Sequence, residues 1–403
     1  MIRVPILRYQ LLILFSSVLL AASVKAEPVK LAVLLPNSGV FSDTGRFAKK
    51  GFLLGVQTEA ADQNVKWEPW VKFEFSDTRN DRDHSLKLAK AAIANGSKAI
   101  LGLTSSKVTL HLRDYVLDEA RVPLIIFGGA VASKIRRKHP LFLRLSLDAQ
   151  QTMLPLAQWL KMHPIVSAAK PRWACIYLDY SYGVSLCDGF KAGYQDIGEE
   201  IGRIPMPFKT LNKKKQIVEL TKLKPDFAVA GVSGAEGIVF VRDYYRFKVH
   251  EKIPLIMTKS AFRSNRLTKH AKTLEEYGTG VGVLNGHIYN PAVENAENQR
   301  FRTLYQKAHK TLPTDNAMYS YDAGRLLVKA LVALEGKWNG AKVIELMKTL
   351  PYKSPRHSDP LKFDSHGDVI NSGYIFRVKR EGNQLVNEVI GSVPPMNMDD
   401  YQK

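Results

Sequence analysis

The 403-residue chain is poor in the residues that catalytic and metal-binding motifs require. It contains two cysteines and ten histidines, and the histidines show no metal-ligand spacing. There is no Walker phosphate loop. Residues 231–234 do not begin a nucleophile elbow, because Ala235 stands at the fifth position, where a glycine is required. We therefore expect no metal, no cofactor and no catalytic site.

Long apolar runs are also scarce. The one near the start spans residues 11–22 and follows Arg3 and Arg8. Its roughly 12 residues fall short of the ~20 that cross a bilayer. Small residues at Val24 and Ala26 fit a signal peptidase site, so residues 1–26 predict a cleaved secretory signal, with an uncleaved anchor as the alternative. No cysteine at this point could accept a lipid, so we expect an exported, soluble protein.

Acidic residues are too few to balance the basic ones. The chain has 58 Lys and Arg against 38 Asp and Glu, a net charge of +20 that falls to +17 if the three cations of residues 1–26 are removed. A basic balance can indicate nucleic acid, an anionic membrane surface or an acidic ligand, and export argues against nucleic acid. Only residues 136–138 and 213–215 form short basic runs. We interpret most of the charge as solvated faces, with a dedicated binding patch as the alternative.

The two cysteines leave two interpretations open. Cys175 lies on an expected strand and Cys187 on the helix that follows it. An exported chain permits a disulfide, which requires that the helix pack its cysteine face onto the strand. Two buried thiols that act as small apolar side chains are the alternative.

Short apolar runs alternate with segments of helical period, which predicts an α/β fold with parallel sheets covered by helices. The roughly 377 residues after residue 26 exceed one hydrophobic core, so we expect two lobes. The expected strands cover residues 29–35, 71–75, 99–103, 123–127, 173–178, 201–206, 227–230, 254–257 and 280–284. Residues 361–363, 373–379 and 384–389 predict an antiparallel ending, with a turn at residues 381–383.

Six segments in order resemble the type I periplasmic solute-binding proteins of ABC transporters, in the leucine/isoleucine/valine-binding branch. They span nearly all of residues 29–392, and their order is more specific than any one of them. They are residues 31–39 with Gly45, 77–85, 102–106, 179–183, 319–323 and 363–368.

The resemblance implies two Rossmann-like lobes joined by three crossover segments, with the ligand in the cleft between them. The first lobe would comprise residues 27–145 and 283–357, and the second residues 146–282 and 358–403. Residues 144–148 and 280–284 look like hinges.

The resemblance also implies a role. The protein would be a periplasmic, non-enzymatic monomer that closes around a small-molecule ligand, an amino acid or an organic acid, and delivers it to an inner-membrane ABC permease. Presentation of the closed form to a membrane receptor is the alternative. An extracytoplasmic enzyme would need a nucleophile and a base that the sequence does not provide.

The first-lobe candidates follow two strand ends, where ligands collect in open α/β sheets. Thr104, Ser105 and Ser106 would place hydroxyls beside the free N–H groups of a helix that begins near residue 107, an uncharged cradle for a carboxylate. Plain helix capping by Ser106 is the alternative. Ser38 would lie at the rim of this cradle.

The next strand end brings Gly129, Ala130 and Val131. Glycine lets a ligand approach the backbone. In the family this turn contributes backbone groups and a threonine to the ligand carboxylate, and Val131 stands at the threonine position here.

The second-lobe candidates show the largest departures from the family. Tyr182 matches a tyrosine that closes over the ligand, and its ring and hydroxyl suit that role. Ser233 stands where the family has another contact. Lys259 and Ser260 stand where amino-acid binders place the acid that pairs with the ligand ammonium, which puts a standard amino acid in doubt. Lys259 and Arg263 could instead receive an anionic group.

Overall fold

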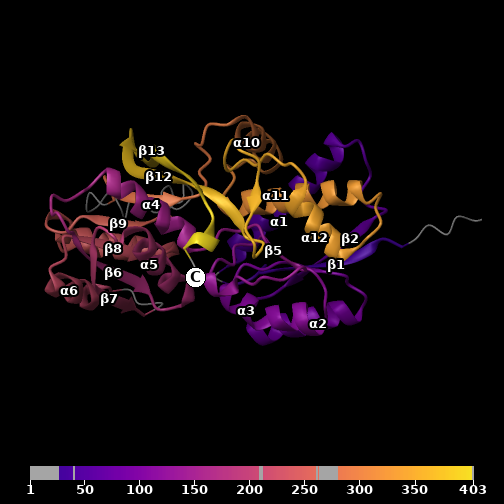
Figure 1. Ribbon diagram of the computed structural model, residues 1–403, viewed down its shortest axis with the longest axis horizontal. Coiled ribbons are helices and arrows are strands. Elements are labelled where there is room, and N and C mark those ends of the chain that lie inside the picture. The colour runs from indigo at the N-terminus through magenta and orange to yellow at the C-terminus, as the bar shows by residue number, and fades with distance from the viewer. Residues whose placement is uncertain (1–26, 40, 208–211, 260–261, 263–279, 402–403) are drawn as a thin grey trace, which may run out of the picture.

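The computed structural model describes residues 27–401 except residues 40, 208–211, 260–261 and 263–279. The expected signal segment and two candidate residues, Ser260 and Arg263, lie outside the described residues. The chain forms two lobes, each built on its own sheet (Figure 1). None of the described helices combines the length and the apolar content needed to span a membrane.

The first sheet has the strand order β2-β1-β3-β4-β5, and all its pairings are parallel. Its strands are β1 (Val29–Leu35), β2 (Val71–Asp77), β3 (Ile100–Gly102), β4 (Leu124–Ile126) and β5 (Phe142–Arg144). Helices cover both faces, so the central strands are apolar along their whole length. One face carries α1 (Ser42–Asp62), whose Phe52 stacks on Phe127 with ring centroids 4.8 Å apart. The other face carries α2 (Arg82–Ala94), α3 (Ser106–Asp114) and the π-helical turn η1 (Tyr115–Glu119).

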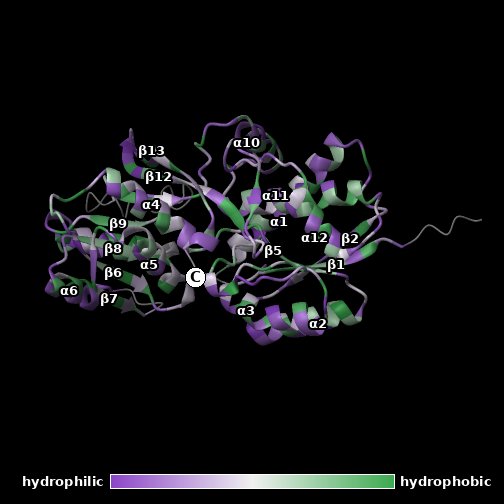
Figure 2. Cartoon of the chain, in the orientation of Figure 1, coloured by the Kyte–Doolittle hydropathy of each residue, from purple (hydrophilic) through white to green (hydrophobic). Residues whose placement is uncertain are grey.

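The second sheet has the order β11-β12-β10-β9-β8-β6-β7, and β13 pairs with β12. Its strands are β6 (Arg172–Leu178), β7 (Glu199–Met206), β8 (Phe227–Gly231), β9 (Leu255–Thr258), β10 (Leu284–His287), β11 (Lys362–Phe363), β12 (Val369–Glu381) and β13 (Gln384–Met396). Strands β6 to β10 are parallel, and β12 runs antiparallel to β10. The helices of this lobe are α4 (Gln150–Met162), α5 (Ser181–Tyr194), α6 (Lys214–Leu223) and α7 (Gly234–Arg246), with the short turn η3 (Val249–Glu251). Figure 2 shows the central strands β8 and β9 as hydrophobic.

The chain passes between the lobes three times. Residues 145–149 lead from β5 to α4, and residues 288–295 lead from β10 to three helices that return to the first lobe, α10 (Ala296–His309), α11 (Asp315–Ala333) and α12 (Gly340–Thr349). Residues 350–361 lead back to β11. The packing of α11 on α1 is close, because a Cβ at Gly51 would lie 2.0 Å from the Ala317 carbonyl oxygen. The predicted α/β fold with two parallel-sheet lobes is confirmed.

The prediction of a strand and hinge at residues 280–284 was wrong. The strand β10 begins only at Leu284, because Gly280 (φ +88°) and Gly282 (φ +86°) have left-handed backbone that interrupts an extended segment. Since β10 belongs to the second sheet, the chain crosses to the first lobe after His287 rather than at residue 283.

The antiparallel ending is longer than expected. The strands β12 and β13 have 13 residues each, and between them Gly382 (φ +54°) lies in the predicted turn. The chain then ends in the short turn η5 (Met398–Asp400), which packs beside α4 through Met398.

Cys175 of β6 and Cys187 of α5 form a disulfide with a Cα–Cα distance of 6.0 Å, so the first of the two interpretations holds. Both cysteines are fully buried in the cluster that α5 forms with the sheet. The bridge therefore fixes the helix whose first turn contains the candidate Tyr182.

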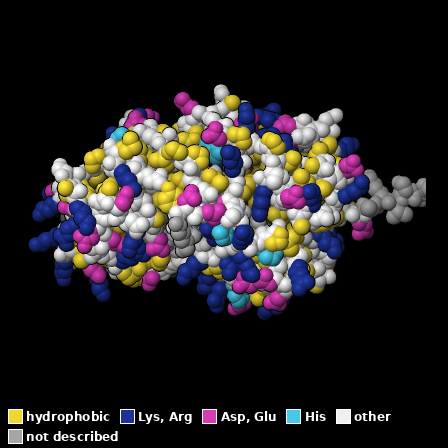
Figure 3. All heavy atoms as spheres, viewed as in Figure 1, with side chains coloured by type: hydrophobic (Ala, Val, Ile, Leu, Met, Phe, Trp, Pro, Cys, Tyr) yellow, Lys and Arg dark blue, Asp and Glu magenta, His cyan; other side chains and the backbone are white. Residues whose placement is uncertain are grey.

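Charged side chains cover the outside of both lobes. Figure 3 shows Lys and Arg spread over the visible face, with a gathering at the end of the second lobe where α6 lies. Most basic residues are exposed, in agreement with solvated faces.

Candidate functional site

The first wall of the candidate site lies at the carboxyl end of β3. Leu103 has a left-handed backbone (φ +56°), which turns the chain sharply, and Thr104 behind it is buried. Ser105 is the N-cap residue of α3, yet its side chain caps none of the helix N–H groups. The first turn of α3 therefore keeps backbone donors and a hydroxyl for another partner. This arrangement is an uncharged cradle that suits a carboxylate.

Ser106 makes a contact that the sequence did not predict. Its Oγ accepts hydrogen bonds from the N–H groups of Val131 (3.3 Å) and Ala132 (3.1 Å). Ser106 therefore joins the β4 end to the start of α3. A ligand would meet a loop that this serine has already positioned.

The loop after β4 is tightly constrained. A Cβ at Gly129 (φ +113°) would lie 2.3 Å from Nδ2 of Asn316, which donates to the Gly128 carbonyl oxygen. The side chain of Ala130 is fully buried, and its carbonyl oxygen accepts from Ser146 Oγ at 2.9 Å. Only small residues fit here, because α11 and the first crossover contact the loop from both sides.

Ser38 lies at the exposed rim of this wall. Its Oγ donates to Asp77 Oδ2 at 2.8 Å, and the Asn37 N–H donates to Oδ1 at 2.7 Å. Although partial desolvation opposes it, hydrogen bonding from the Asn37 and Arg79 N–H groups lowers the pKa of Asp77. The rim loop is thus attached to the end of β2.

The second wall consists of hydroxyl groups at the carboxyl ends of β6 and β8. Tyr180 and Ser233 are the N-cap residues of α5 and α7, and their hydroxyl oxygens lie 3.1 Å apart. The ring centroids of Tyr180 and Tyr182 are 5.9 Å apart. Desolvation of the hydroxyl and the neighbouring Tyr182 raise the pKa of Tyr180, so this hydroxyl stays neutral although the residue is 36% exposed. The structure therefore brings Tyr182 and Ser233 together through Tyr180.

Sequence reasoning missed Tyr180. It lies in the same segment, residues 179–183, that pointed to Tyr182. The signal was a second aromatic residue two positions earlier, directly at the expected end of the strand. An N-cap position directs such a side chain toward the next loop instead of into the helix.

The two walls meet at the junction of the lobes. Val131 from the first wall and Tyr182 from the second pack against the same hydrophobic cluster, which contains Leu186 of α5. The Ser133 N–H also donates to Ser185 Oγ of α5 at 3.3 Å. A hollow of about 700 Å³ opens beside this junction, and it is lined by residues of both lobes, including Ser133, Lys134, Tyr180, Ser181 and Ser185.

Lys259 lies apart from these hydroxyls, at the end of β9. It is 4% exposed, and its ammonium donates to the Tyr289 carbonyl oxygen at 2.5 Å and lies 4.9 Å from the centre of the Phe376 ring. The side chain therefore connects β9 to the second crossover.

Comparison with known proteins identifies the family of this chain. A model described as periplasmic binding protein matches residues 28–383. The chain belongs to the periplasmic binding protein family. This is a family of binding proteins and not of enzymes.

The relatives whose names state a function are distant in sequence. The Leu/Ile/Val-binding protein homolog 6 of Brucella melitensis is 26% identical over 374 residues, which cover 89% of each chain. An ABC transporter substrate-binding protein from Sphaerobacter thermophilus has a TM-score of 0.81 at 20% identity, covering 92% of this chain and 99% of that one. A solute-binding protein of R. palustris in complex with 4-hydroxybenzoate has a TM-score of 0.78 at 24% identity, covering 92% and 98%. These two structures share the fold.

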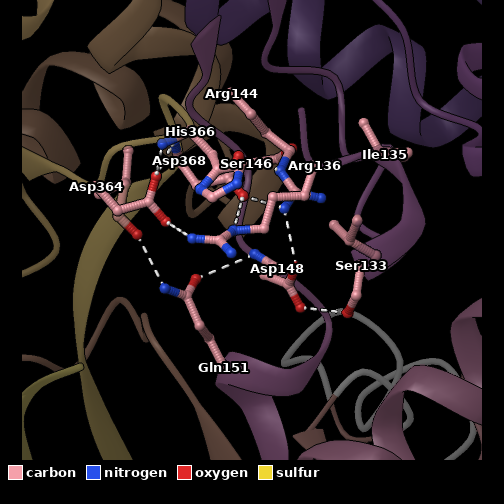
Figure 4. A network of polar contacts seen from close by, with 12 residues as sticks. Ser133, Ile135, Arg136, Arg144, Ser146, Asp148, Gln151, Asp364, His366 and Asp368 are labelled. Atoms are coloured by element: carbon pink, nitrogen blue, oxygen red, sulfur yellow. Dashed lines mark hydrogen bonds and ion pairs between the residues drawn. The ribbon is translucent and has the colours of Figure 1, made fainter. Parts of the chain in front are cut away.

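In this periplasmic binding protein the first crossover is fixed by a buried arginine (Figure 4). Arg144, the last residue of β5, is fully buried and pairs with Asp148 (2.9 Å) and Asp368 (2.5 Å). A third bond goes to the Ala132 carbonyl oxygen at 3.0 Å. Burial alone would lower the pKa of Arg144, but the two carboxylates raise it, so the side chain remains charged.

A second buried arginine connects the third crossover of the binding protein to the first crossover and to both lobes. Arg356 donates to Asp322 of α11 at 2.9 Å, to Asn371 of β12 at 3.0 Å and to the Leu145 carbonyl oxygen at 2.7 Å. Its partners thus come from the first lobe, the second lobe and the first crossover. These contacts fix the position of the third crossover relative to both lobes.

A third cation, Arg136, compensates a cluster that could otherwise resemble a metal site. Asp364, His366 and Asp399 place ligand atoms within 4.8 Å of one another. The Arg136 guanidinium pairs with Asp364 at 2.6 Å and also with Asp399. Its positive charge stands where a metal ion would be needed, so we interpret the cluster as an ion-pair network.

Proposed function

We propose that this chain is the solute-binding component of an ABC transporter, which captures a small organic acid in the periplasm and delivers it to an inner-membrane permease. Two findings support transport: the family match and the names of the distant relatives. The observation that carries the ligand class is that the first lobe presents a neutral donor cradle at Ser105 and the first turn of α3, and the second lobe presents the tyrosine wall.

A carboxylate fits this cradle, because backbone N–H groups at a helix N-terminus stabilise negative charge without a paired cation. The amino acids named in the Brucella relative and the 4-hydroxybenzoate named in the R. palustris structure both have a carboxylate. The rings of Tyr180 and Tyr182 can cover the rest of such a molecule, and their hydroxyls can bond its polar substituents.

The second wall favours an acid without an ammonium group. The side chains of this wall that the structure brings together are hydroxyl-bearing, and the residue that follows β9, where amino-acid binders carry an acid, is the buried cation Lys259. A ligand ammonium enclosed there would lose its hydration without a carboxylate at this position to pair with it. We therefore propose an organic acid, aromatic or aliphatic, rather than a standard amino acid.

Binding would proceed by hinge closure. The three crossovers, residues 145–149, 288–295 and 350–361, connect the lobes. A ligand that contacts both walls stabilises the closed state by its differential affinity for that state.

Titration calorimetry on protein that has been unfolded and refolded to remove any co-purified solute tests this proposal. The panel comprises benzoate, 4-hydroxybenzoate, short aliphatic acids and leucine. We expect at least one acid to bind with micromolar or tighter affinity and leucine to bind far more weakly. Tight leucine binding, or no binding by any acid, would contradict it.

A further inference from the structure

An exposed basic surface lies at the end of the second lobe, away from the candidate site. The helix α6 presents three lysines to solvent, and the ends of α6 and α7 add further cations, so that exposed cations outnumber the exposed acids Glu219 and Glu251. Figure 3 shows this gathering in dark blue at the far end of the lobe. The exposed cations are Lys214, Lys215, Lys222, Lys224, Arg246, Lys248 and Lys252. We call this set, with Val218 and Phe247, the α6 surface.

Two apolar side chains lie exposed among these cations. Val218 is 42% and Phe247 36% exposed. Lys214 Nζ lies 5.9 Å and Arg246 Cζ 6.0 Å from the centre of the Phe247 ring. The α6 surface therefore combines an aromatic ring with flanking cations, which is typical of segments that enter the interface of a lipid bilayer.

A hollow of about 700 Å³ runs along α6. Its lining consists of Asn212, Lys214, Lys215, Val218, Glu219 and Lys222. Ile217 and Leu220 on the opposite side of α6 are buried in the lobe, so the rotation of the helix is fixed by its core. The lysines are consequently held at the rim of the hollow.

These lysines are not used to stabilise the fold. Within the part of the chain that the structure describes, no ion pair involves Lys214, Lys215 or Lys222. The neighbouring Lys213 shows the contrast, because it is fully buried and pairs with Glu236 at 2.5 Å. An unused set of like charges destabilises a compact protein slightly unless a partner of opposite charge compensates it.

We propose that the α6 surface binds the headgroups of anionic phospholipids and so holds the protein at a membrane face. Lysine suits this partner, since a flexible point charge can follow headgroups that have no fixed geometry, whereas a carboxylate-bearing protein surface favours the planar fork of arginine. Six of the seven exposed cations listed above are lysines, and the seventh, Arg246, lies beside Phe247. The ring of Phe247 would enter the interface between the headgroups.

Co-sedimentation with lipid vesicles tests the proposal. The full protein is mixed at low ionic strength with vesicles of phosphatidylglycerol and phosphatidylcholine, or of phosphatidylcholine alone. We expect binding to the anionic vesicles, none to the neutral ones, and loss of binding at high salt. Neutralising three lysines, Lys214→Gln with Lys215→Gln and Lys222→Gln, should lower the partition coefficient roughly a hundredfold, at about fivefold per lysine.

A matched variant distinguishes the surface from net charge. Lys66→Gln with Lys87→Gln and Lys98→Gln removes the same charge from exposed lysines of the first lobe. This control should keep at least half of the vesicle binding. Equal loss in both triple variants, unchanged binding in the α6 variant, or equal binding to neutral vesicles would overturn the proposal, as would absence of binding to anionic vesicles at low salt.

Two further measurements keep the result interpretable. Circular dichroism and thermal unfolding should show that both triple variants fold like the parent, because all six lysines are exposed. Phe247→Ser should weaken binding severalfold with the charge unchanged, and unchanged binding would contradict the role of the ring. None of these tests requires a ligand in the cleft, so their failure leaves the proposed function untouched.

Discussion

The hinge and the cleft walls of this protein use opposite chemistry. Around the crossovers, Arg144 and Arg356 are fully buried and each pairs with a buried carboxylate. On the walls, the groups that meet are hydroxyls and backbone amides at Ser105, Ser106 and Tyr180. Full charges therefore define how the lobes are joined, whereas the candidate walls present neutral groups.

Removal of a hinge cation should have the largest effect. Arg144→Met would leave Asp148 and Asp368 buried without their counter-charge, so we expect the free energy of unfolding to fall by about 3–5 kcal/mol. Urea denaturation measures it. The control is Arg137→Met, whose partners Asp114 and Asp118 are well exposed, and it should cost less than about 1 kcal/mol. Similar losses in the two variants would contradict the distinction.

Removal of the disulfide should rank second. The bond closes a 12-residue separation between β6 and α5, and a loop of this size contributes about 3 kcal/mol. Cys175→Ala combined with Cys187→Ala should lower the free energy of unfolding by that amount, which urea denaturation measures as a lower midpoint. Since α5 begins at the second wall, ligand affinity should fall as well. A variant that unfolds at the same urea concentration as the parent would show that the bridge contributes nothing.

Changes to the second wall should affect binding more than stability. Tyr182→Ala should weaken the bound acid roughly tenfold to a hundredfold, because it removes a ring that covers the ligand. Tyr182→Phe retains the ring and should lose only the contribution of the hydroxyl. Titration calorimetry compares the affinities of the parent protein and the two variants for the acid. If the Tyr182→Ala variant binds the acid as tightly as the Tyr182→Phe variant does, Tyr182 lies outside the site.

The smallest expected effect is a pH dependence of the free energy of unfolding, which arises from Asp399 at the edge of the hinge. Although desolvation opposes it, hydrogen bonding from the Ser365 N–H, Arg136 and His366 lowers the pKa of Asp399. The folded pKa lies below the unfolded one, so this stabilisation is present above the unfolded value near ~3.9 and is lost as pH falls below it. Asp399→Asn should therefore cost about 1 kcal/mol at pH 7 and less at pH 3.

Urea unfolding of both proteins at the two pH values measures this difference. The two stability curves should converge at low pH. Parallel curves would show that Asp399 does not titrate with folding.

The alternation of apolar runs predicted most of the fold, because a strand buried on both faces must be apolar along its length, as Ile100–Gly102 and Phe227–Gly231 are. The error at residues 280–284 arose where apolar residues alternate with Gly280 and Gly282. Their positive φ depends on the tertiary fold and leaves no trace in hydrophobicity.

The site was predicted less completely. Residue type pointed to hydroxyls at strand ends, but which of Ser105 and Ser106 anchors the neighbouring loop depends on the direction of each side chain. Residues 144–148 were predicted as a hinge, but the buried ion pairs of Arg144 and Arg356 were not, because a charged residue usually indicates a surface position. Only the fold places Asp368 of the C-terminal segment beside Arg144. The sequence left undecided whether Cys175 and Cys187 form a disulfide, because the bond depends on the rotation of α5 about its axis.

Small-angle X-ray scattering tests the central claim, that two lobes close around an organic acid, most directly. The protein is measured free and with the tightest acid of the calorimetric panel, and the Tyr182→Ala variant serves as the control. We predict that the radius of gyration decreases when the parent protein binds the acid and that the variant requires much more acid for the same change. A scattering profile that stays the same at saturating ligand would contradict closure of the lobes.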